Sequence, residues 1–199
     1  MNVFILDCAE NKHTKLDIGF VMAYSGSNTY GNWNQFKLVA KQIVGLHNFG
    51  VDGIQAGVVT LSDNATLKIK FSAHSTKSAF ETALDLLDSG RYWGNSRRIL
   101  PVLETAITAM FNPNNGMRTE SEKVAILITD GPENAQGTEY EKMAKRFKQK
   151  DIRLKVVRVG NFPNDPLKLL VSHENDYVSA RNFKYLLNEG RGFEVEDIC

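Results

Sequence analysis

Short apolar segments alternate with segments of helical periodicity along most of this chain. Val124 to Thr129 is the most continuous apolar run, as expected of a strand at the centre of a parallel sheet. Residues 32–44 instead carry apolar side chains at helical spacing. This alternation favours one doubly wound α/β domain with helices on both faces of its sheet. Strands are expected at 18–24, 54–61, 65–71, 124–129, 154–159 and 177–180, and helices begin near 32, 80, 99, 140, 166 and 182.

The link between the second and third expected strands contains only Ser62, Asp63 and Asn64. Three residues cannot carry a parallel crossover, so these two strands must form an antiparallel hairpin. Lys68 and Lys70 occupy the outward positions of the third strand, where lysine protects an exposed sheet edge. The sequence therefore predicts an antiparallel edge strand on a mostly parallel sheet.

Composition excludes several classes of protein. The 199 residues carry a formal net charge of +1, which argues against nucleic acid as a general partner. Crossing a bilayer takes roughly 20 consecutive apolar residues, and no segment approaches that length, so membrane insertion is not expected. We expect an N-terminal extension over residues 1–14 and a single domain over residues 15–199.

The two cysteines, Cys8 and Cys199, lie at opposite ends of the chain. The termini of a compact domain are often close together, so these cysteines can pair and tie the ends. A disulfide implies an oxidising compartment, whereas free thiols would suit a cytosolic protein. Asn64 begins an Asn-Ala-Thr glycosylation sequon, which also favours a secreted protein.

Two polar loops are expected to meet at one edge of the sheet. In open α/β sheets, ligands bind beyond the carboxyl ends of strands, where the direction of winding reverses. If the first and fourth strands are neighbours there, Ser25 and Ser27 lie near Asp130. Hydroxyl and carboxylate oxygens suit Mg²⁺ or Mn²⁺ far better than zinc. Alternatively, Ser25 and Ser27 form a turn that caps local backbone amides, and Asp130 holds that turn.

Catalysis is not expected at these loops, and we assign no catalytic residue. A serine nucleophile would need a histidine, and there is no Gly-x-Ser-x-Gly motif to present the serine. None of the four histidines falls in either loop; they are His13, His47, His74 and His173.

The run from Asp17 to Val21, followed by Ser25-Gly26-Ser27, resembles the first strand and loop of von Willebrand factor A-type domains. Phe111 with the Ile126–Gly131 segment resembles the end of the family's central helix and its fourth strand. The cysteines, just outside the first strand and last helix, also fit. The resemblance implies a six-stranded, mostly parallel sheet with one antiparallel edge strand. It also implies a metal-ion-dependent adhesion site.

The metal loop departs from the family pattern, which reads Asp-x-Ser-x-Ser. Ala23 replaces its leading aspartate, which cuts the formal charge of the site from about −2 to −1, and Mg²⁺ sheds water reluctantly. The family's threonine should fall at Arg97, although a shift of one residue supplies Ser96. An arginine at this position would repel a cation and can pair with Asp130 instead. The expected ligands are Ser25, Ser27 and Asp130, with Mg²⁺ or Mn²⁺ weakly bound or absent and no cofactor required.

A basic and aromatic segment provides a second candidate, a partner-binding loop. It contains Arg91, Trp93, Arg97 and Arg98, and arginine with aromatic residues is typical of interaction hot spots. We hypothesise that it binds a protein or an anionic glycan without a metal bridge. The alternative is a solvated loop with Trp93 packed into the core.

The resemblance implies a secreted adhesion or matrix-assembly module in a longer multidomain chain, with collagen or another matrix protein as partner. Two alternatives remain open. The domain is either a structural spacer without its own ligand, or an intracellular scaffold if its cysteines are free.

Whether the two cysteines are paired or free distinguishes a secreted protein from an intracellular one. If Cys8 and Cys199 form a disulfide, alkylation without reductant adds no mass to the intact chain. Intact-mass spectrometry before and after alkylation measures this. A gain of two alkyl groups would favour the intracellular scaffold.

Overall fold

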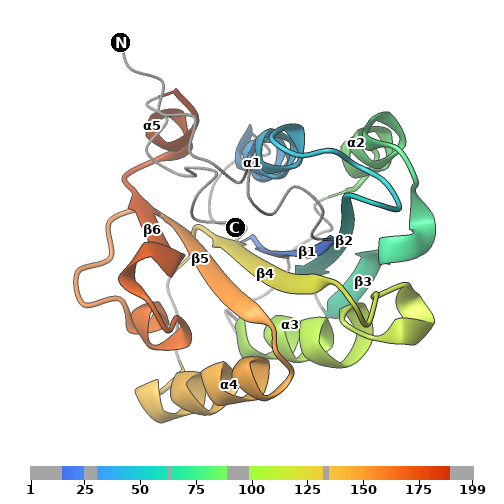
Figure 1. The fold of residues 1–199 in the computed structure, drawn as a ribbon. Coiled ribbons are helices and arrows are strands. Elements are labelled where there is room, and N and C mark those ends of the chain that lie inside the picture. The colour runs from blue at the N-terminus through green and yellow to red at the C-terminus, as the bar shows by residue number, and fades with distance from the viewer. Residues whose placement is uncertain (1–14, 25–30, 62–63, 89–98, 132–134, 189–199) are drawn as a thin grey trace, which may run out of the picture.

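The computed structural model describes residues 15–24, 31–61, 64–88, 99–131 and 135–188. Within them, the strands form one six-stranded sheet in the order β3-β2-β1-β4-β5-β6 (Figure 1). All neighbouring strands are parallel except β2 and β3, which confirms the antiparallel edge. The strands are β1 (Leu16–Ala23), β2 (Ile54–Leu61), β3 (Ala65–Ile69), β4 (Glu122–Thr129), β5 (Arg153–Val159) and β6 (Tyr177–Ala180).

Helices cover both faces of the sheet, as the alternation of elements predicts (Figure 1). One face carries α1 (Gly31–Gly45), α2 (Lys77–Asp85) and α5 (Phe183–Asn188). The other carries α3 (Ile99–Thr105) and α4 (Gly137–Gln149). Short 3₁₀ turns are η2 (Phe71–Ala73), η4 (Pro113–Asn115), η5 (Pro166–Leu170) and η6 (Glu174–Asp176). None of the helices in the described ranges has the length and apolar character needed to cross a bilayer.

Strand β1 lies at the centre of the sheet and is buried along its whole length. Ile18, Phe20 and Met22 face the layer of α1 and α2, whereas Val21 and Ala23 face the layer of α3. Because successive side chains of a strand point to opposite faces, both faces of β1 need apolar residues. This requirement explains the continuous apolar run at the start of the domain.

Gly19 lets the end of the central helix approach β1 closely. A Cβ atom at this position would lie 2.2 Å from Met110 Cε and 2.8 Å from the Phe111 ring. The expected single helix over 99–110 is instead α3 followed by a π-helical turn, η3 (Ala106–Met110). The Phe111 amide donates to the Ala106 carbonyl at 2.9 Å, which closes this wider turn.

Five expected strand boundaries differ from the structure by one or two residues, including the starts of β4 at Glu122 and of β5 at Arg153 and the end of β1 at Ala23. Strand β3 ends at Ile69 rather than Phe71, because Phe71 enters a 3₁₀ turn and its side chain is fully buried. Strand β1 begins at Leu16 rather than Ile18, so that Asp17 lies inside a buried strand.

Asp17 is fully buried, and its charge is matched by Arg118. The Arg118 Nε donates to Asp17 Oδ1 at 2.8 Å, and the Arg118 backbone amide donates to Oδ2 at 2.7 Å. The other two nitrogens of the guanidinium group also donate to backbone carbonyls. Nη1 donates to Val51 at 2.8 Å, and Nη2 donates to Leu16 and Gly53, both at 3.0 Å. The pair therefore joins the starts of β1 and β2 to the segment before β4.

Replacing Arg118 with methionine should destabilise the domain by about 3–5 kcal/mol, because Asp17 would remain as an uncompensated buried charge. Urea denaturation measures the loss. Lys15→Met is the matched control, since Lys15 pairs with Glu120 at 3.5 Å near the surface and its loss should cost less than about 1 kcal/mol. Equal losses in the two variants would contradict the structural role of the buried pair.

Candidate functional site

The candidate site lies where the winding of the sheet reverses, between β1 and β4. Ala23 and Thr129, the last residues of these strands, are register partners. Asp130 follows β4 directly and is 8% exposed. The expected adjacency of the first and fourth strands is therefore confirmed, and Asp130 lies at their shared carboxyl edge.

Most of the other residues predicted for the site fall outside the described part of the chain. Asn64 is described, and it is exposed at the hairpin between β2 and β3, where its glycosylation stays a prediction. The roles of the remaining predicted residues also stay predictions; these residues are Ser25, Ser27 and Ser96 as ligands, Arg91, Trp93, Arg97 and Arg98 for partner binding, and Cys8 and Cys199 for the disulfide.

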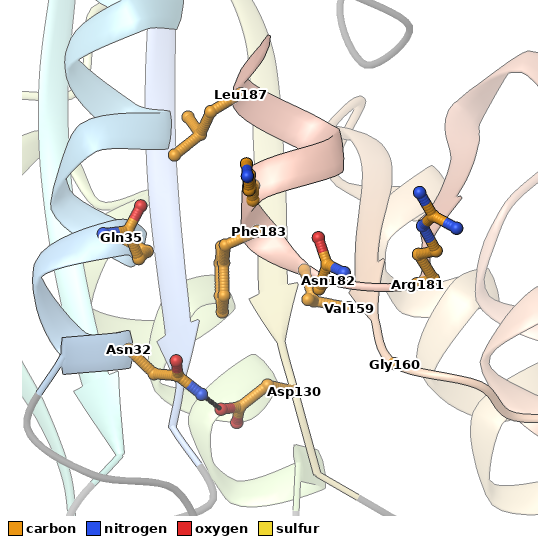
Figure 2. Close-up of a pocket in the computed structure, with 10 residues that line it drawn as sticks. Asn32, Gln35, Asp130, Val159, Gly160, Arg181, Asn182, Phe183 and Leu187 are labelled. Carbon is orange, nitrogen blue, oxygen red and sulfur yellow. Dashed lines mark hydrogen bonds between the residues drawn. The ribbon is translucent and has the colours of Figure 1, made fainter. Parts of the chain in front are cut away.

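Among the described residues, the expected metal ligand at this edge is the carboxylate of Asp130. Ala23 stands where the family's aspartate would stand, and its methyl group is buried in the apolar cluster of α3. Asn32 Nδ2 donates to Asp130 Oδ2 at 3.4 Å, so a hydrogen-bond donor already faces this carboxylate (Figure 2). Among the described residues, no three His, Cys, Asp or Glu side chains are grouped closely enough to hold a metal ion.

A pocket of about 590 Å³ opens beside Asp130 between α1 and α5 (Figure 2). Val159, Phe183 and Leu187 form its apolar part. Figure 2 shows Arg181 at the rim, with its guanidinium group directed away from Asp130. The polar lining consists of Asn32, Gln35, Asp130, Gly160, Arg181, Asn182 and Lys184.

The charges of this pocket favour an anionic ligand. Arg181 and Lys184 are both exposed, whereas Asp130 is the single carboxylate among the described residues of the lining. The Arg181 guanidinium lies 5.1 Å from the ring centroid of Tyr185, which supports it at the rim. With two cations and one carboxylate, these charges attract a carboxylate or sulfate group of a ligand more strongly than they attract a cation.

A buried arginine supports the loop that follows β4. Arg158, on β5, is 1% exposed and donates to the carbonyl of Gly131. Its Nε lies 2.6 Å from Asp165 Oδ2, and the Tyr177 hydroxyl donates to the same oxygen at 2.7 Å. Burial, with the Asp165 carboxylate, raises the pKa of Tyr177 above its ordinary value, so the hydroxyl remains a donor. This network fixes the backbone next to Asp130.

Several pocket residues were missed by the sequence analysis. In the sequence, Asn32 and Gln35 are ordinary positions of a helix. Arg181 precedes the last helix, and Lys184 lies within it. No motif marks them, because α1 and α5 meet only in the folded chain. They could have been found from the rule that ligands bind beyond the carboxyl ends of strands where the winding reverses. That rule would have to be applied to every helix that begins at the carboxyl edge of the sheet.

The order of strands and the position of the pocket define an open α/β domain with a pocket at the switch point of its sheet. A family model for the von Willebrand factor type A domain matches residues 17–189, and the chain belongs to this family.

Curated relatives are extracellular matrix proteins. The chain is 27% identical to the collagen alpha-1(XII) chain of Notophthalmus viridescens, over 98% of this chain and 20% of that one. It is 30% identical to the collagen alpha-6(VI) chain of Mus musculus, over 62% of this chain and 5% of that one. Matrilin-1 of Gallus gallus is 24% identical, over 96% of this chain and 38% of the relative. The chain thus spans well under half of each relative.

Solved structures show the same fold. Proximal thread matrix protein 1 from the mussel byssus is 27% identical, with a TM-score of 0.74 over 88% of this chain and 44% of that chain. A second structure of that protein, with a zinc-occupied MIDAS motif, is 26% identical, with a TM-score of 0.75 over 89% of this chain and 45% of that chain. MIDAS denotes the metal-ion-dependent adhesion site.

Restoring the missing carboxylate should restore metal affinity. We expect Ala23→Asp to bind Mg²⁺ or Mn²⁺ at least about tenfold more tightly than the natural chain, because a second carboxylate would face the cation. Calorimetric titration of the metal-free proteins measures this, with circular dichroism to establish folding. Ala23→Asn is the matched control, since it adds an oxygen without a charge. Micromolar Mg²⁺ binding by the natural chain would contradict the weakened site.

Proposed function

We propose that this chain is a non-enzymatic adhesion module of a secreted extracellular matrix protein, and one domain of a longer multidomain chain. It binds a matrix protein such as collagen, or an anionic glycan, at the carboxyl edge of its sheet. Membership of the von Willebrand factor type A family and similarity to collagens and matrilin-1 support this proposal.

The observation that carries the proposal is the pocket beside Asp130, whose lining includes Arg181 and Lys184. An acidic side chain of a partner can enter it and accept hydrogen bonds from these cations and from the Asn32 and Gln35 amides. Hydrogen bonds to charged groups contribute about 1.5–3 kcal/mol each, which suffices for recognition without a bridging metal.

The proposed partner surface also includes the basic segment with Arg91, Trp93, Arg97 and Arg98. Arg97 and Arg98 directly precede α3 in the sequence. Ala23, in place of the leading carboxylate, removes one charge that would hold a cation at this edge. Binding through arginine and lysine therefore replaces binding through the metal.

Metal-independent binding can be tested on immobilised collagens by surface plasmon resonance. We expect EDTA to leave binding unchanged, because the contacts are made by side chains of the chain itself. Arg97→Ala with Arg98→Ala, and separately Arg181→Ala with Lys184→Ala, should each weaken binding at least about tenfold.

The matched control is Lys68→Ala with Lys70→Ala, which removes two exposed charges at the β3 edge and should leave binding unchanged. Complete dissociation in EDTA would contradict metal independence. A natural chain that binds no collagen or other matrix component would instead identify a structural spacer.

A further inference from the structure

Positive charge is concentrated in the second half of α4 and the turn after it. Residues 142–153 contain one carboxylate, Asp151, and have a formal charge of +5, against +1 for the whole chain. The rest of the molecule is therefore net negative. The six basic residues of the segment are Lys142, Lys145, Arg146, Lys148, Lys150 and Arg153.

Only the two arginines of this segment are paired within the described residues. Arg146 forms a bidentate pair with Glu104, with Nη2 and Oε1 2.7 Å apart. Arg153 Nη2 lies 2.8 Å from Asp176 Oδ1. The four lysines are exposed and make no ion pair with any described carboxylate; we call Lys142, Lys145, Lys148 and Lys150 the α4 lysine face.

The helix dipole explains only part of this pattern. Cations favour the last turn of a helix, and the effect fades within that turn. In α4 the last turn contains Arg146 and Lys148, whereas Lys142 and Lys145 come before it. Their positions therefore call for another explanation.

Helical periodicity places three of these lysines in one row. Lys142, Lys145 and Lys148 follow each other at intervals of three residues, and the row spans about 9 Å along the axis. Tyr140, Met143 and Phe147 are buried and mark the side of the helix that faces the core. The exposed carboxylate nearest the row in sequence is Glu141, so the row keeps an excess of positive charge.

A hollow of about 480 Å³ continues the row at the end of α4. Lys148, Arg153 and His173 line it, together with the carboxylates of Asp151 and Asp176. Asp176 is 2% exposed and already faces two cations, Arg153 and Lys155, the latter at 3.0 Å. Lys148 therefore joins the hollow to the lysine row.

The α4 lysine face lacks the apolar anchors of a protein interface. Among the described residues, Leu169 on η5 is the exposed large apolar side chain near α4, and it lies at the opposite end, against Gly137. A row of lysines without anchors suits a linear polyanion, whose binding is driven by release of counterions.

We propose that the α4 lysine face binds a sulfated glycosaminoglycan chain. The choice of a sulfated glycan among polyanions rests on the extracellular location proposed above. The surface itself is separate from the site beside Asp130, because α4 covers the opposite face of the sheet from α1 and α5 (Figure 1).

Heparin is the probe for this proposal, with the full chain titrated calorimetrically at several salt concentrations. Replacing all four lysines of the face with alanine should weaken heparin binding at least about tenfold at physiological salt. It should also reduce the slope of log K against log salt by about 3–4, since each contact with a polyanion contributes about one.

The matched control replaces four lysines outside both proposed binding surfaces with alanine: Lys41, Lys68, Lys70 and Lys77. It removes the same charge without touching the α4 lysine face or the pocket beside Asp130, and the affinity for heparin should fall less than about threefold. Urea denaturation and circular dichroism of both variants establish that they fold. Equal losses in the two variants, or no heparin binding by the natural chain, would overturn the proposal.

Two further measurements test the selectivity for sulfate and distinguish failure of this proposal from failure of the proposed adhesion function. Desulfated heparin and poly-glutamate should bind at least about tenfold more weakly than heparin, and equal binding of either would overturn selectivity for sulfate. Collagen binding is measured in parallel for the four-lysine variant of α4 and for Arg181→Ala with Lys184→Ala. If the α4 proposal fails, collagen binding still responds to Arg181 and Lys184; if the adhesion proposal fails, heparin binding still responds to the α4 lysine face.

Discussion

The buried pair of Asp17 and Arg118 joins segments that are about a hundred residues apart in the chain. Arg118 satisfies the carboxylate and also binds backbone carbonyls before β2, so it secures the amino edge of the three central strands. The register of β1 and β4 runs without interruption from Leu16 to Ala23. Because the strands start together, they also end together, and Asp130 is delivered to the carboxyl edge.

A fully buried arginine, Arg158, supports the chain at that carboxyl edge. Arg158 is held by Asp165 and binds the carbonyl of Gly131, so the loop with Asp130 has a firm support. Buried charges cost several kcal/mol each unless they are matched, and both arginines here are matched. The framework for an adhesion site therefore remains in place although Ala23 has replaced a carboxylate.

The distribution of charge gives the domain two different surfaces. The pocket beside Asp130 combines cations, amides and apolar side chains, which suits a folded partner with an acidic group. The α4 lysine face has cations without apolar anchors, and it lies on the other layer of helices. A net charge of +1 conceals both features, because the negative charge of the remaining chain cancels the local excess.

Local patterns in the sequence predicted the strands and helices and the antiparallel hairpin before β3, and the weakened metal site at Ala23 stays a prediction. Each follows from periodicity, a short link or a single position. Only the tertiary structure revealed that Arg118 matches Asp17 and that α5 brings Arg181 and Lys184 to the edge where Asp130 lies. It also showed which cations of residues 142–153 are paired. Such contacts depend on how distant segments pack, and spacing along the chain carries no record of that packing.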